Sequence, residues 1–387
     1  MPGLVIHDLS PEEWEGIKKD YDGWETVSDN GTIKPCIGCF GCWKKTPGCC
    51  VVKDGYENMG ALIHHADEVT VISRYTFGGF SGFVKNVFDR CLAYVLPQFE
   101  ISGGESHHQK RYAEDKPFTF IIYGKDLSEY EKNCARRYVA AVCANIRGHV
   151  KDVAFREGEA LPAREAPVPA ETSAQEDPGK ALLLNCSMRS EKGNSAKLSK
   201  QLAERLKTGS ETVALKKYSG DVPGLLERIE QAPSLVLCMP LYVDGLPSQA
   251  VRFMETALRE YRGGAKKVYV LLNMGLYESG QLVNLFEAVR QWCGAMDFEY
   301  CGGLGVSSGE VVGVLLNSLP LKAGFTSRMS KGMDRLAAAI DGGDSCGDIY
   351  ADLAGFPRPL FVAIANNSWK SGAKANGLKP SDLYRQF

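Results

Sequence analysis

Residues 233–258 read PSLVLCMPLYVDGLPSQAVRFMETAL, and residues 66–92 read ADEVTVISRYTFGGFSGFVKNVFDRCL. Each stretch joins a short, almost continuous apolar run to a glycine-containing loop and then to an amphipathic helix. Apolar runs of this kind are typical of strands buried on both faces, as in a parallel sheet that helices cover. The two stretches therefore predict strand–loop–helix units of an α/β fold.

The same order of units occurs twice along the chain. The strands LVIHDL and PFTFIIYG of the first half correspond to ALLLNCS and KKVYVLLNMG of the second half. Residues at constant offsets agree: Ala66, Val71 and Gly79 match Ala232, Leu237 and Gly245 at 166 positions, and Lys116 and Cys143 match Lys266 and Cys293 at 150 positions. We therefore predict two tandem, doubly wound parallel-sheet domains of the α/β class, with ligands at the carboxyl ends of the strands.

Composition marks the boundaries between these domains. Residues 158–178, GEALPAREAPVPAETSAQEDP, are rich in Pro, Ala and Glu and lack hydrophobic periodicity, which indicates a linker. The predicted domains are residues 1–157 and residues 179–341. Residues 342–387 are too polar for a further domain, and we expect this extension to dock across one of the domains and cover the edge of a site.

The chain has 387 residues, a formal net charge of −2 and 44% hydrophobic residues, which gives no general attraction to nucleic acid or membranes. No apolar run approaches the roughly 20 residues that span a bilayer. The acidic N-terminal stretch MPGLVIHDLSPEEW is unlike a secretory signal. We therefore expect a cytoplasmic protein whose 13 cysteines are reduced.

The first strand of the second half is followed by the polar loop SMRSEKGNS and then by a helix. Gly193 permits a turn, Asn194 or Ser195 can cap the helix, and Arg189 adds positive charge. Backbone N–H groups, hydroxyls such as that of Ser187, and the helix dipole would converge on one anion. The spacing matches neither the nucleoside-triphosphate loop nor the dinucleotide fingerprint.

Two further strand ends of the second half carry loops that suit a flat ligand. The loop PLYVDG spans residues 240–245, and Asn273, Met274 and Gly275 follow the next strand. Together with the anion loop, these strand ends indicate a phosphorylated, planar, heteroaromatic ligand.

These motifs resemble the NADPH-dependent FMN reductase and iron–sulfur flavoprotein branch of the flavodoxin-like superfamily. The resemblance rests on SMRSEKGNS with PLYVDGLPSQ, and on CIGCFGCWKKTPGCCVVKDG with FGGFSGFVKNVFDR. It implies FMN as cofactor and NAD(P)H as co-substrate. By resemblance, the phosphate would be held by Ser187, Arg189, Gly193, Asn194 and Ser195, and the isoalloxazine would be bordered by Pro240, Leu241, Tyr242, Val243, Asp244, Gly245, Met274 and Gly275.

Each half departs from the family pattern in its own way. In the first half the first strand leads into SPEEWEGIKKD, where Asp8 and Glu13 would repel a phosphate, and Arg74 replaces the usual proline. We infer that this half has lost its own FMN site. The second half lacks a cysteine loop. Because relatives are implied to act as dimers, we expect an intramolecular pseudo-dimer in which cysteines of one half face the flavin of the other. Association into a homo-oligomer stays open.

The stretch KPCIGCFGCWKKTPGCC, residues 34–50, holds Cys36, Cys39 and Cys42 in a C-x2-C-x2-C pattern, with Cys49 or Cys50 as a fourth thiol. Such a set can bind a [4Fe–4S] cluster, bind zinc, or remain as free thiols without metal. The family pattern selects Cys50. Downstream, Asp89 and Arg90 of VFDR are expected to form an ion pair at a helix end.

The resulting expectation is an FMN-dependent NAD(P)H oxidoreductase that passes electrons to a small acceptor or to an iron–sulfur centre. The alternative is an FMN electron-transfer protein, with or without a [4Fe–4S] cluster, that takes electrons from a redox-protein partner. A flavin-free structural module is a third reading. No catalytic side chain is assigned, because the flavin would carry the chemistry.

Overall fold

The computed structural model describes residues 2–159, 161–162, 164–165, 179–316 and 324–387. The chain divides into two units. Unit 1 comprises Met1–Leu161, Val243–Ser248 and Pro359–Phe387, and unit 2 comprises Pro162–Tyr242 and Gln249–Arg358. Most of the predicted linker, residues 158–178, lies outside the described residues.

Unit 1 contains a parallel five-stranded sheet with the strand order β2-β1-β3-β6-β7. The central strands β1 and β3 are buried along almost their whole length, as their apolar sequences require. The strands are β1 (Leu4–His7), β2 (Glu25–Val27), β3 (Val69–Arg74), β6 (Pro117–Tyr123) and β7 (His149–Arg156).

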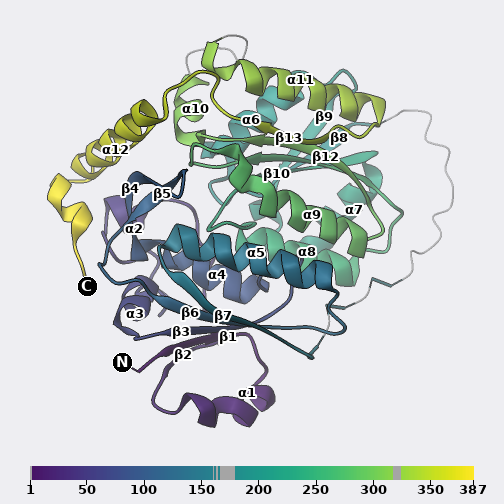
Figure 1. Ribbon diagram of the computed structural model, residues 1–387. Helices are drawn as coiled ribbons and strands as arrows, with labels where there is room; N and C mark the ends of the chain where they lie inside the picture. Colours follow the sequence, from purple (N-terminus) through teal and green to yellow (C-terminus); the bar gives the residue numbers. More distant parts are fainter. Residues whose placement is uncertain (1, 160, 163, 166–178, 317–323) are drawn as a thin grey trace. The chain divides into compact units, whose positions relative to one another are not determined.

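Alternate residues of this sheet enter two different cores. Leu4 and Ile6 pack into the large core with α3, α4 and α5, whereas Val5 faces the other side with Trp14 of α1. Figure 1 shows α1 on one side of the sheet and α4 and α5 on the other. The helices are α1 (Pro11–Ile17), α2 (Gly41–Lys44), α3 (Met59–His65), α4 (Gly82–Arg90), α5 (Glu129–Ile146) and α12 (Arg358–Lys374).

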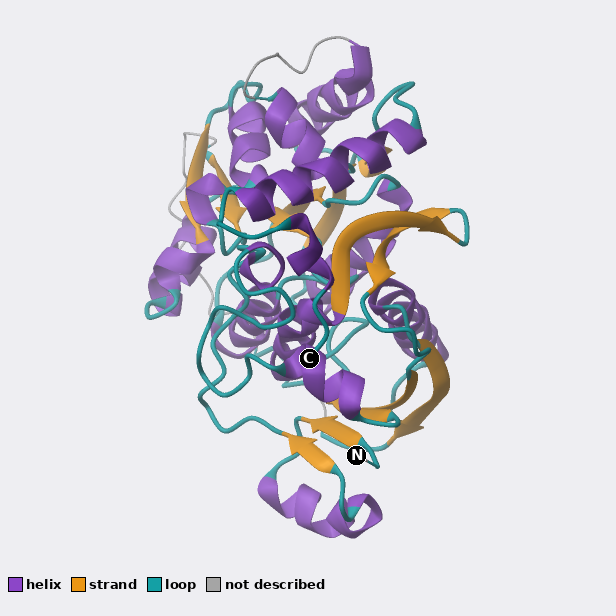
Figure 2. Cartoon of the chain, turned by 90° about the vertical axis from the view of Figure 1, so that its left-hand side faces the viewer, coloured by secondary structure: helices purple, strands orange, loops and turns teal. Residues whose placement is uncertain are grey.

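Side-chain caps determine where two of these helices begin. At α5, Ser128 and Glu131 form a reciprocal capping box. At α4, the Ser81 hydroxyl accepts a hydrogen bond from the backbone N–H of Val84. A separate antiparallel ribbon of β4 (Val95–Ser102) and β5 (Glu105–Lys110) completes unit 1, and Figure 2 shows it as curved orange strands.

Unit 2 contains a parallel six-stranded sheet with the order β13-β12-β11-β10-β8-β9. The strand β13 lies within the predicted extension 342–387. The strands are β8 (Ala181–Asn185), β9 (Ser210–Ala214), β10 (Ser234–Pro240), β11 (Lys267–Asn273), β12 (Glu299–Val306) and β13 (Gly347–Ala351). The helices are α6 (Asn194–Ala203), α7 (Val222–Gln231), α8 (Ser248–Glu260), α9 (Val283–Ala295), α10 (Gly309–Leu315) and α11 (Ser327–Gly342).

Numbered along the chain within each parallel sheet, the five strands of unit 1 and the first five strands of unit 2 follow the same order, 2-1-3-4-5, which is the flavodoxin-like arrangement. The prediction of two flavodoxin-like, doubly wound α/β sheets is therefore confirmed. In this arrangement the chain reverses its direction of winding between the first and third strands. Ligands of such sheets bind at the carboxyl ends of those strands, which here are β1 and β3 in unit 1 and β8 and β10 in unit 2.

Candidate functional site

In unit 2, the loop between β8 and α6 lies at the position where the sheet reverses its direction of winding. The helix α6 begins after Gly193, an N-cap residue that offers no side-chain acceptor, and among the described residues no side chain caps this helix. The first N–H groups of an α-helix have no partner within the helix. Together with the helix dipole, they make this end of α6 suitable for an anion.

Two side chains shape this loop. The carboxamide of Asn185 accepts a hydrogen bond from the Ser187 N–H at 3.0 Å and donates one to the Ser190 carbonyl at 3.2 Å. The buried Ser187 hydroxyl accepts from the Arg189 N–H at 3.3 Å. A Cβ atom on Gly193 would lie 2.8 Å from that hydroxyl, so glycine is needed for the close approach. The loop therefore holds Ser187 next to the start of α6.

The side chains of Asn194 and Ser195 are turned toward other parts of unit 2. Asn194 Nδ2 donates to the Gly309 carbonyl at 2.8 Å, and the Ser195 hydroxyl accepts from Asn273 Nδ2 at 2.7 Å. Both contacts tie the start of α6 to the ends of neighbouring strands. In this arrangement, an anion at α6 would receive backbone N–H groups and the Ser187 hydroxyl rather than the Asn194 side chain.

Two buried serines complete this edge of the sheet and were not predicted from the sequence. Ser307 and Ser308 follow β12, and both are fully buried. Their hydroxyls have no hydrogen-bond partner within the described part of the chain. The Ser308 N–H donates to Leu276, and the Gly309 N–H donates to Met274, so these serines adjoin the predicted Met274–Gly275 loop. The sequence pattern that could have indicated them is the polar run Ser307-Ser308-Gly309 directly after a buried strand.

The loop after β10 changes its conformation at Val243. Leu241 is bonded to β11 through its N–H, which donates to the Asn273 carbonyl at 2.8 Å. Val243 and Asp244 then adopt left-handed backbone conformations, with φ of 39° and 57°. A β-branched residue in this region is strained, so tertiary contacts must hold the segment. Residues 243–248 group with unit 1.

The cysteine loop of unit 1 is held by a buried arginine. Arg90, at the end of α4, pairs with both carboxylate oxygens of Asp54 at 2.8 and 2.9 Å. Its guanidinium also donates to the carbonyls of Lys34 at 2.8 Å and Val52 at 3.1 Å. These contacts join the segment before the cysteines to the segment after them. The Cys50 thiol lies close enough to the same guanidinium to raise the pKa of Arg90, although burial opposes this shift.

The expected Asp89–Arg90 ion pair is wrong. Asp89 instead pairs with Lys85, one helical turn earlier on α4. Residues at i and i+4 share a helix face, whereas neighbours in sequence point in different directions. Asn86, on the same helix, accepts a hydrogen bond from the Cys36 N–H at 3.3 Å and one from the Ser248 hydroxyl at 3.1 Å.

Four of the five clustered thiols interact with one another. Burial raises the pKa of Cys36 to about 12, and the charge of Asp89 and the neighbouring Cys50 and Cys39 add to this effect. Burial also raises the pKa of Cys42, with contributions from the other three thiols.

Cys49 is placed differently, because its Sγ lies 3.2 Å from Asn58 Oδ1 and 3.5 Å from Lys53 Nζ. The structure thus groups Cys36, Cys39, Cys42 and Cys50.

This thiol group is a candidate metal site by its residue types. Among the described residues, no set of three or more His, Cys, Asp or Glu side chains could hold one metal ion. Iron–sulfur cubes take one thiolate at each corner, so their ligands surround a larger core. Arg90 beside Cys50, and Arg111 whose charge reaches Cys42, would offset thiolate charge. Four thiolates are the donor type that a [4Fe–4S] cluster takes.

The C-terminal segment 359–387 packs on the cysteine loop. Trp369 of α12 lies edge-on to Phe40 at 5.3 Å and to Trp43 at 5.2 Å between ring centroids. Farther on, Arg111 Nη1 donates to the carbonyls of Leu383 at 2.9 Å and Arg385 at 2.6 Å. The ring of Phe387 adjoins Gly48, two residues before Cys50. Aromatic side chains therefore cover the loop that carries the thiols.

In unit 1, a protein carboxylate occupies the carboxyl end of the first strand. Asp8 accepts hydrogen bonds from the Arg74 N–H at 3.1 and 3.2 Å and from the Tyr123 hydroxyl at 2.9 Å. His7 is buried and stacks on Trp14 at 4.1 Å. Side chains of the unit thus fill the region where a phosphate loop would stand.

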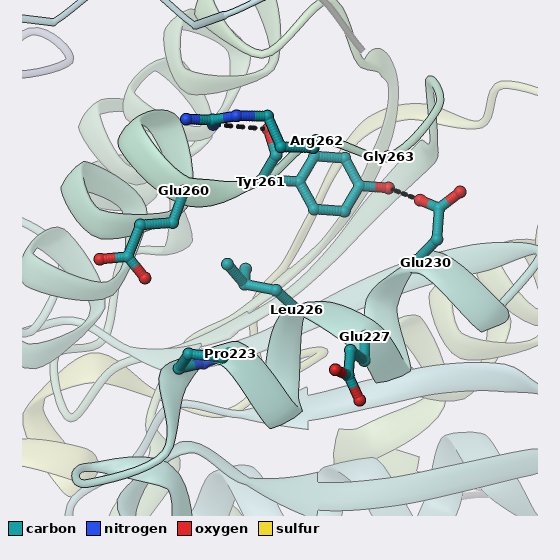
Figure 3. A pocket seen from close by; sticks show the side chains of 8 residues that line it. All are labelled: Pro223, Leu226, Glu227, Glu230, Glu260, Tyr261, Arg262 and Gly263. Atoms are coloured by element: carbon teal, nitrogen blue, oxygen red, sulfur yellow. Dashed lines mark hydrogen bonds between the residues drawn. The ribbon is translucent and has the colours of Figure 1, made fainter. Parts of the chain in front are cut away.

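The pocket in Figure 3 lies at the other edge of the unit 2 sheet, where strands begin. It measures ≈ 320 Å³ and is formed by α7 and by the end of α8 with the residues that follow it. The Tyr261 hydroxyl points to Glu230 and bonds to it. None of the predicted ligand-binding residues lines this pocket: the lining residues are Pro223, Leu226, Glu227, Glu230, Glu260, Tyr261, Arg262 and Gly263.

Within the described residues, no helix is both long enough and apolar enough to cross a membrane. No protein-family model and no curated protein matches the sequence.

Several solved structures show a distant likeness to this chain. A Trp repressor binding protein from Bacillus subtilis is 16% identical, with 37% of this chain and 99% of that chain covered at a TM-score of 0.28. An azoreductase from Bacillus anthracis str. Sterne is 14% identical, with 42% and 99% covered at a TM-score of 0.30. RosB, solved with 8-demethyl-8-formylriboflavin-5'-phosphate bound, is 17% identical, with 30% and 59% covered at a TM-score of 0.25. These scores are too low to assign a function.

Proposed function

We propose that the protein is an FMN-dependent NAD(P)H oxidoreductase, with the flavin phosphate at the start of α6. The observation that carries this proposal is the uncapped start of α6 beside the buried Ser187 hydroxyl, at the ligand-binding edge of a flavodoxin-like sheet. Bound FMN would supply acceptance of hydride from NAD(P)H and onward donation of electrons.

The residues of the chain would bind and orient this group. Backbone N–H groups at α6 and the Ser187 hydroxyl would hold the phosphate, with Arg189 adding charge. The unpartnered hydroxyls of Ser307 and Ser308 suit a polar edge of the ring. The predicted phosphate set is Ser187, Arg189, Gly193, Asn194 and Ser195, and the predicted ring set is residues 240–245 with Met274 and Gly275.

The cysteine loop is proposed as a [4Fe–4S] site with Cys36, Cys39, Cys42 and Cys50 as ligands. The mutual interaction of these four thiols supports Cys50 rather than Cys49 as the fourth ligand. Bound there, the cluster would supply one-electron transfer. Burial raises the pKa of Cys36 and Cys42, so loading of the cluster would release protons from these thiols.

A visible spectrum of anaerobically purified protein tests both cofactors. Flavin bands with release of FMN on denaturation are expected, together with additional absorption near roughly 400 nm from iron–sulfur charge transfer. A colourless protein that neither binds added FMN nor oxidises NAD(P)H would refute the proposal. Bound FMN without NAD(P)H turnover would favour the alternative, an electron-transfer protein that takes electrons from a redox partner.

A further inference from the structure

Three side chains of unit 1, the buried His107 and Asp244 with the half-buried Asn145 between them, form a hydrogen-bonded chain that ends in the segment after β10. Asn145 Nδ2, on α5, lies 2.6 and 2.7 Å from the two carboxylate oxygens of Asp244. At its other end, Asn145 Oδ1 lies 2.7 Å from His107 Nδ1, on β5. His107 Nε2 then faces Glu105 Oε2 at 3.9 Å. The chain runs from a buried carboxylate to a half-exposed one.

The chemistry of these groups determines the direction of every hydrogen bond in the chain. An amide nitrogen only donates, and an amide oxygen only accepts. Asn145 therefore donates to Asp244 and accepts from His107, which must carry its proton on Nδ1. Contact of one amide nitrogen with both oxygens of Asp244 suits the carboxylate form, because a carboxyl O–H directed at that nitrogen would find no acceptor there.

The surroundings of Asp244 disfavour that carboxylate form. Its side chain is almost fully buried, and burial raises the pKa of Asp244 to about 7 even though Asn145 and the charge of Lys85 oppose the shift. The Lys85 ammonium is bonded to Asp89. The titratable groups around Asp244 are Lys85 and Asp89 of α4, Glu105 and His107 of β5, and Tyr138 and Cys143 of α5.

A second arrangement of the same side chains gives the O–H of a protonated Asp244 a hydrogen-bond acceptor, and it needs no movement of the backbone. If the Asn145 amide turns by half a rotation, its oxygen accepts from the Asp244 O–H and its nitrogen donates to His107 Nδ1. His107 must then carry its proton on Nε2, which faces Glu105. Asp244 takes up one proton from solvent. His107 loses the proton on Nδ1 and gains one on Nε2, so the imidazole stays neutral.

We propose that Asp244, Asn145 and His107 form a reversible hydrogen-bond switch, through which the segment 243–248 responds to pH. Asp244 follows Val243, whose left-handed backbone conformation is strained, so the side-chain contact of Asp244 helps to hold that segment.

The imidazole nitrogens report the switch directly. In the wild-type protein, ¹⁵N NMR of His107 between pH 5 and 9 should show the Nδ1–H tautomer at high pH and the Nε2–H tautomer at low pH. The ¹³C carboxyl shift of Asp244 should titrate with the same midpoint, near pH 7. One tautomer at every pH, unequal midpoints, or a doubly protonated imidazole in place of the tautomer change would overturn the proposal.

Variants provide matched controls. Asp244→Asn removes the titrating group and should leave His107 in one tautomer at every pH. Asp152→Asn, an exposed position on β7 of the same unit, should titrate as the wild type does. An Asp244→Asn protein whose His107 still changes tautomer would refute the switch. If that variant fails to fold, the two wild-type midpoints still decide the question.

Discussion

Arg90 and Asp54 form a buried two-pronged ion pair, with Nη1–Oδ2 at 2.8 Å and Nη2–Oδ1 at 2.9 Å. The same guanidinium binds backbone carbonyls on both sides of the cysteine loop. One side chain therefore closes a loop of nearly 20 residues, and its replacement should affect the thiols as well as the stability.

Replacing Arg90 tests whether this side chain holds the two ends of the cysteine loop together. Arg90→Lys keeps the charge but cannot form the planar two-pronged pair, and it should lower the free energy of unfolding by about 3 kcal/mol. Urea unfolding measures this loss, and reaction with a thiol reagent should show faster labelling of Cys36 and Cys42. Arg136→Lys, whose side chain is 46% exposed in the same unit, should change neither quantity. Equal effects of the two substitutions would contradict the role of Arg90.

The stability that the Arg90–Asp54 pair contributes should depend on pH, because Asp54 is titratable. Burial alone would raise the pKa of Asp54, but hydrogen bonds from Arg90 and from backbone N–H groups lower it to about 2. A carboxyl group with a depressed folded-state pKa contributes stability above pH ~4 and loses it as pH falls through 2. Asp54→Asn should therefore remove about 2 kcal/mol at pH 7 and much less at pH 2. Acid unfolding curves of both proteins measure this convergence, and a constant difference between them would contradict it.

The proposed phosphate site can be disturbed at its closest contact. A Cβ on Gly193 would meet the Ser187 hydroxyl at 2.8 Å, so Gly193→Ala should push that hydroxyl aside. We expect FMN affinity to fall about tenfold in Gly193→Ala and in Ser187→Ala, since one hydrogen bond to a charged group contributes about 1.5 kcal/mol or more. Quenching of FMN fluorescence measures the affinity.

A glycine elsewhere in unit 2 supplies the control. A Cβ on Gly220 meets no atom within 4 Å, so Gly220→Ala should bind FMN as the wild type does. Unchanged FMN affinity in both Gly193→Ala and Ser187→Ala would show that the phosphate lies elsewhere.

The adjacent cysteines of the loop should behave differently. Cys50→Ser should lose most bound iron and sulfide, because Cys50 belongs to the interacting thiol group. Cys49→Ser should keep both, because the Cys49 thiol contacts Lys53 and Asn58 instead. Iron and sulfide assays on anaerobically purified proteins measure the difference. Equal metal content in the two variants would argue against Cys50 as a ligand.

His7 should make the fold sensitive to acid. Burial lowers the pKa of His7 to about 4, and neither ring nitrogen has a hydrogen-bond partner in the described structure. A base with a depressed folded-state pKa costs stability as pH falls below about 6.5, by up to about 3 kcal/mol near pH 4. His7→Phe keeps the stack on Trp14 and should flatten this part of the stability profile. His65→Phe, at an exposed position, should not, and thermal unfolding between pH 4 and 7 compares the two.

The fold could be predicted from the sequence because it depends on local patterns. Apolar runs such as those of β8 and β10 mark parallel strands, and their repetition gives two sheets of the same order. Side-chain partners distant in sequence have no such pattern. Arg90 has an acidic neighbour at Asp89, yet it pairs with Asp54, 36 positions away, because helix geometry directs the neighbours apart.

Other contacts described above could not be predicted either, because their partners are also distant in sequence. Asn194 fits a phosphate-binding motif, but its side chain bonds to Gly309, 115 positions away. The packing of Trp369 on Phe40 and Trp43 joins parts of the chain with no common periodicity. Likewise, the pairing of Asn145 with Asp244 spans 99 positions and could not be read from either local stretch.

The aromatic cover of the cysteine loop has a consequence for biosynthesis. The loop ends at residue 50 and its cover begins at residue 359, so more than 300 residues separate their emergence from the ribosome. At roughly 5–20 residues per second, the four thiols are uncovered for roughly 15–60 s in a nascent chain. Residues that later shield the loop are absent during that interval, so solvent and small reagents reach the four thiols more easily than in the folded chain.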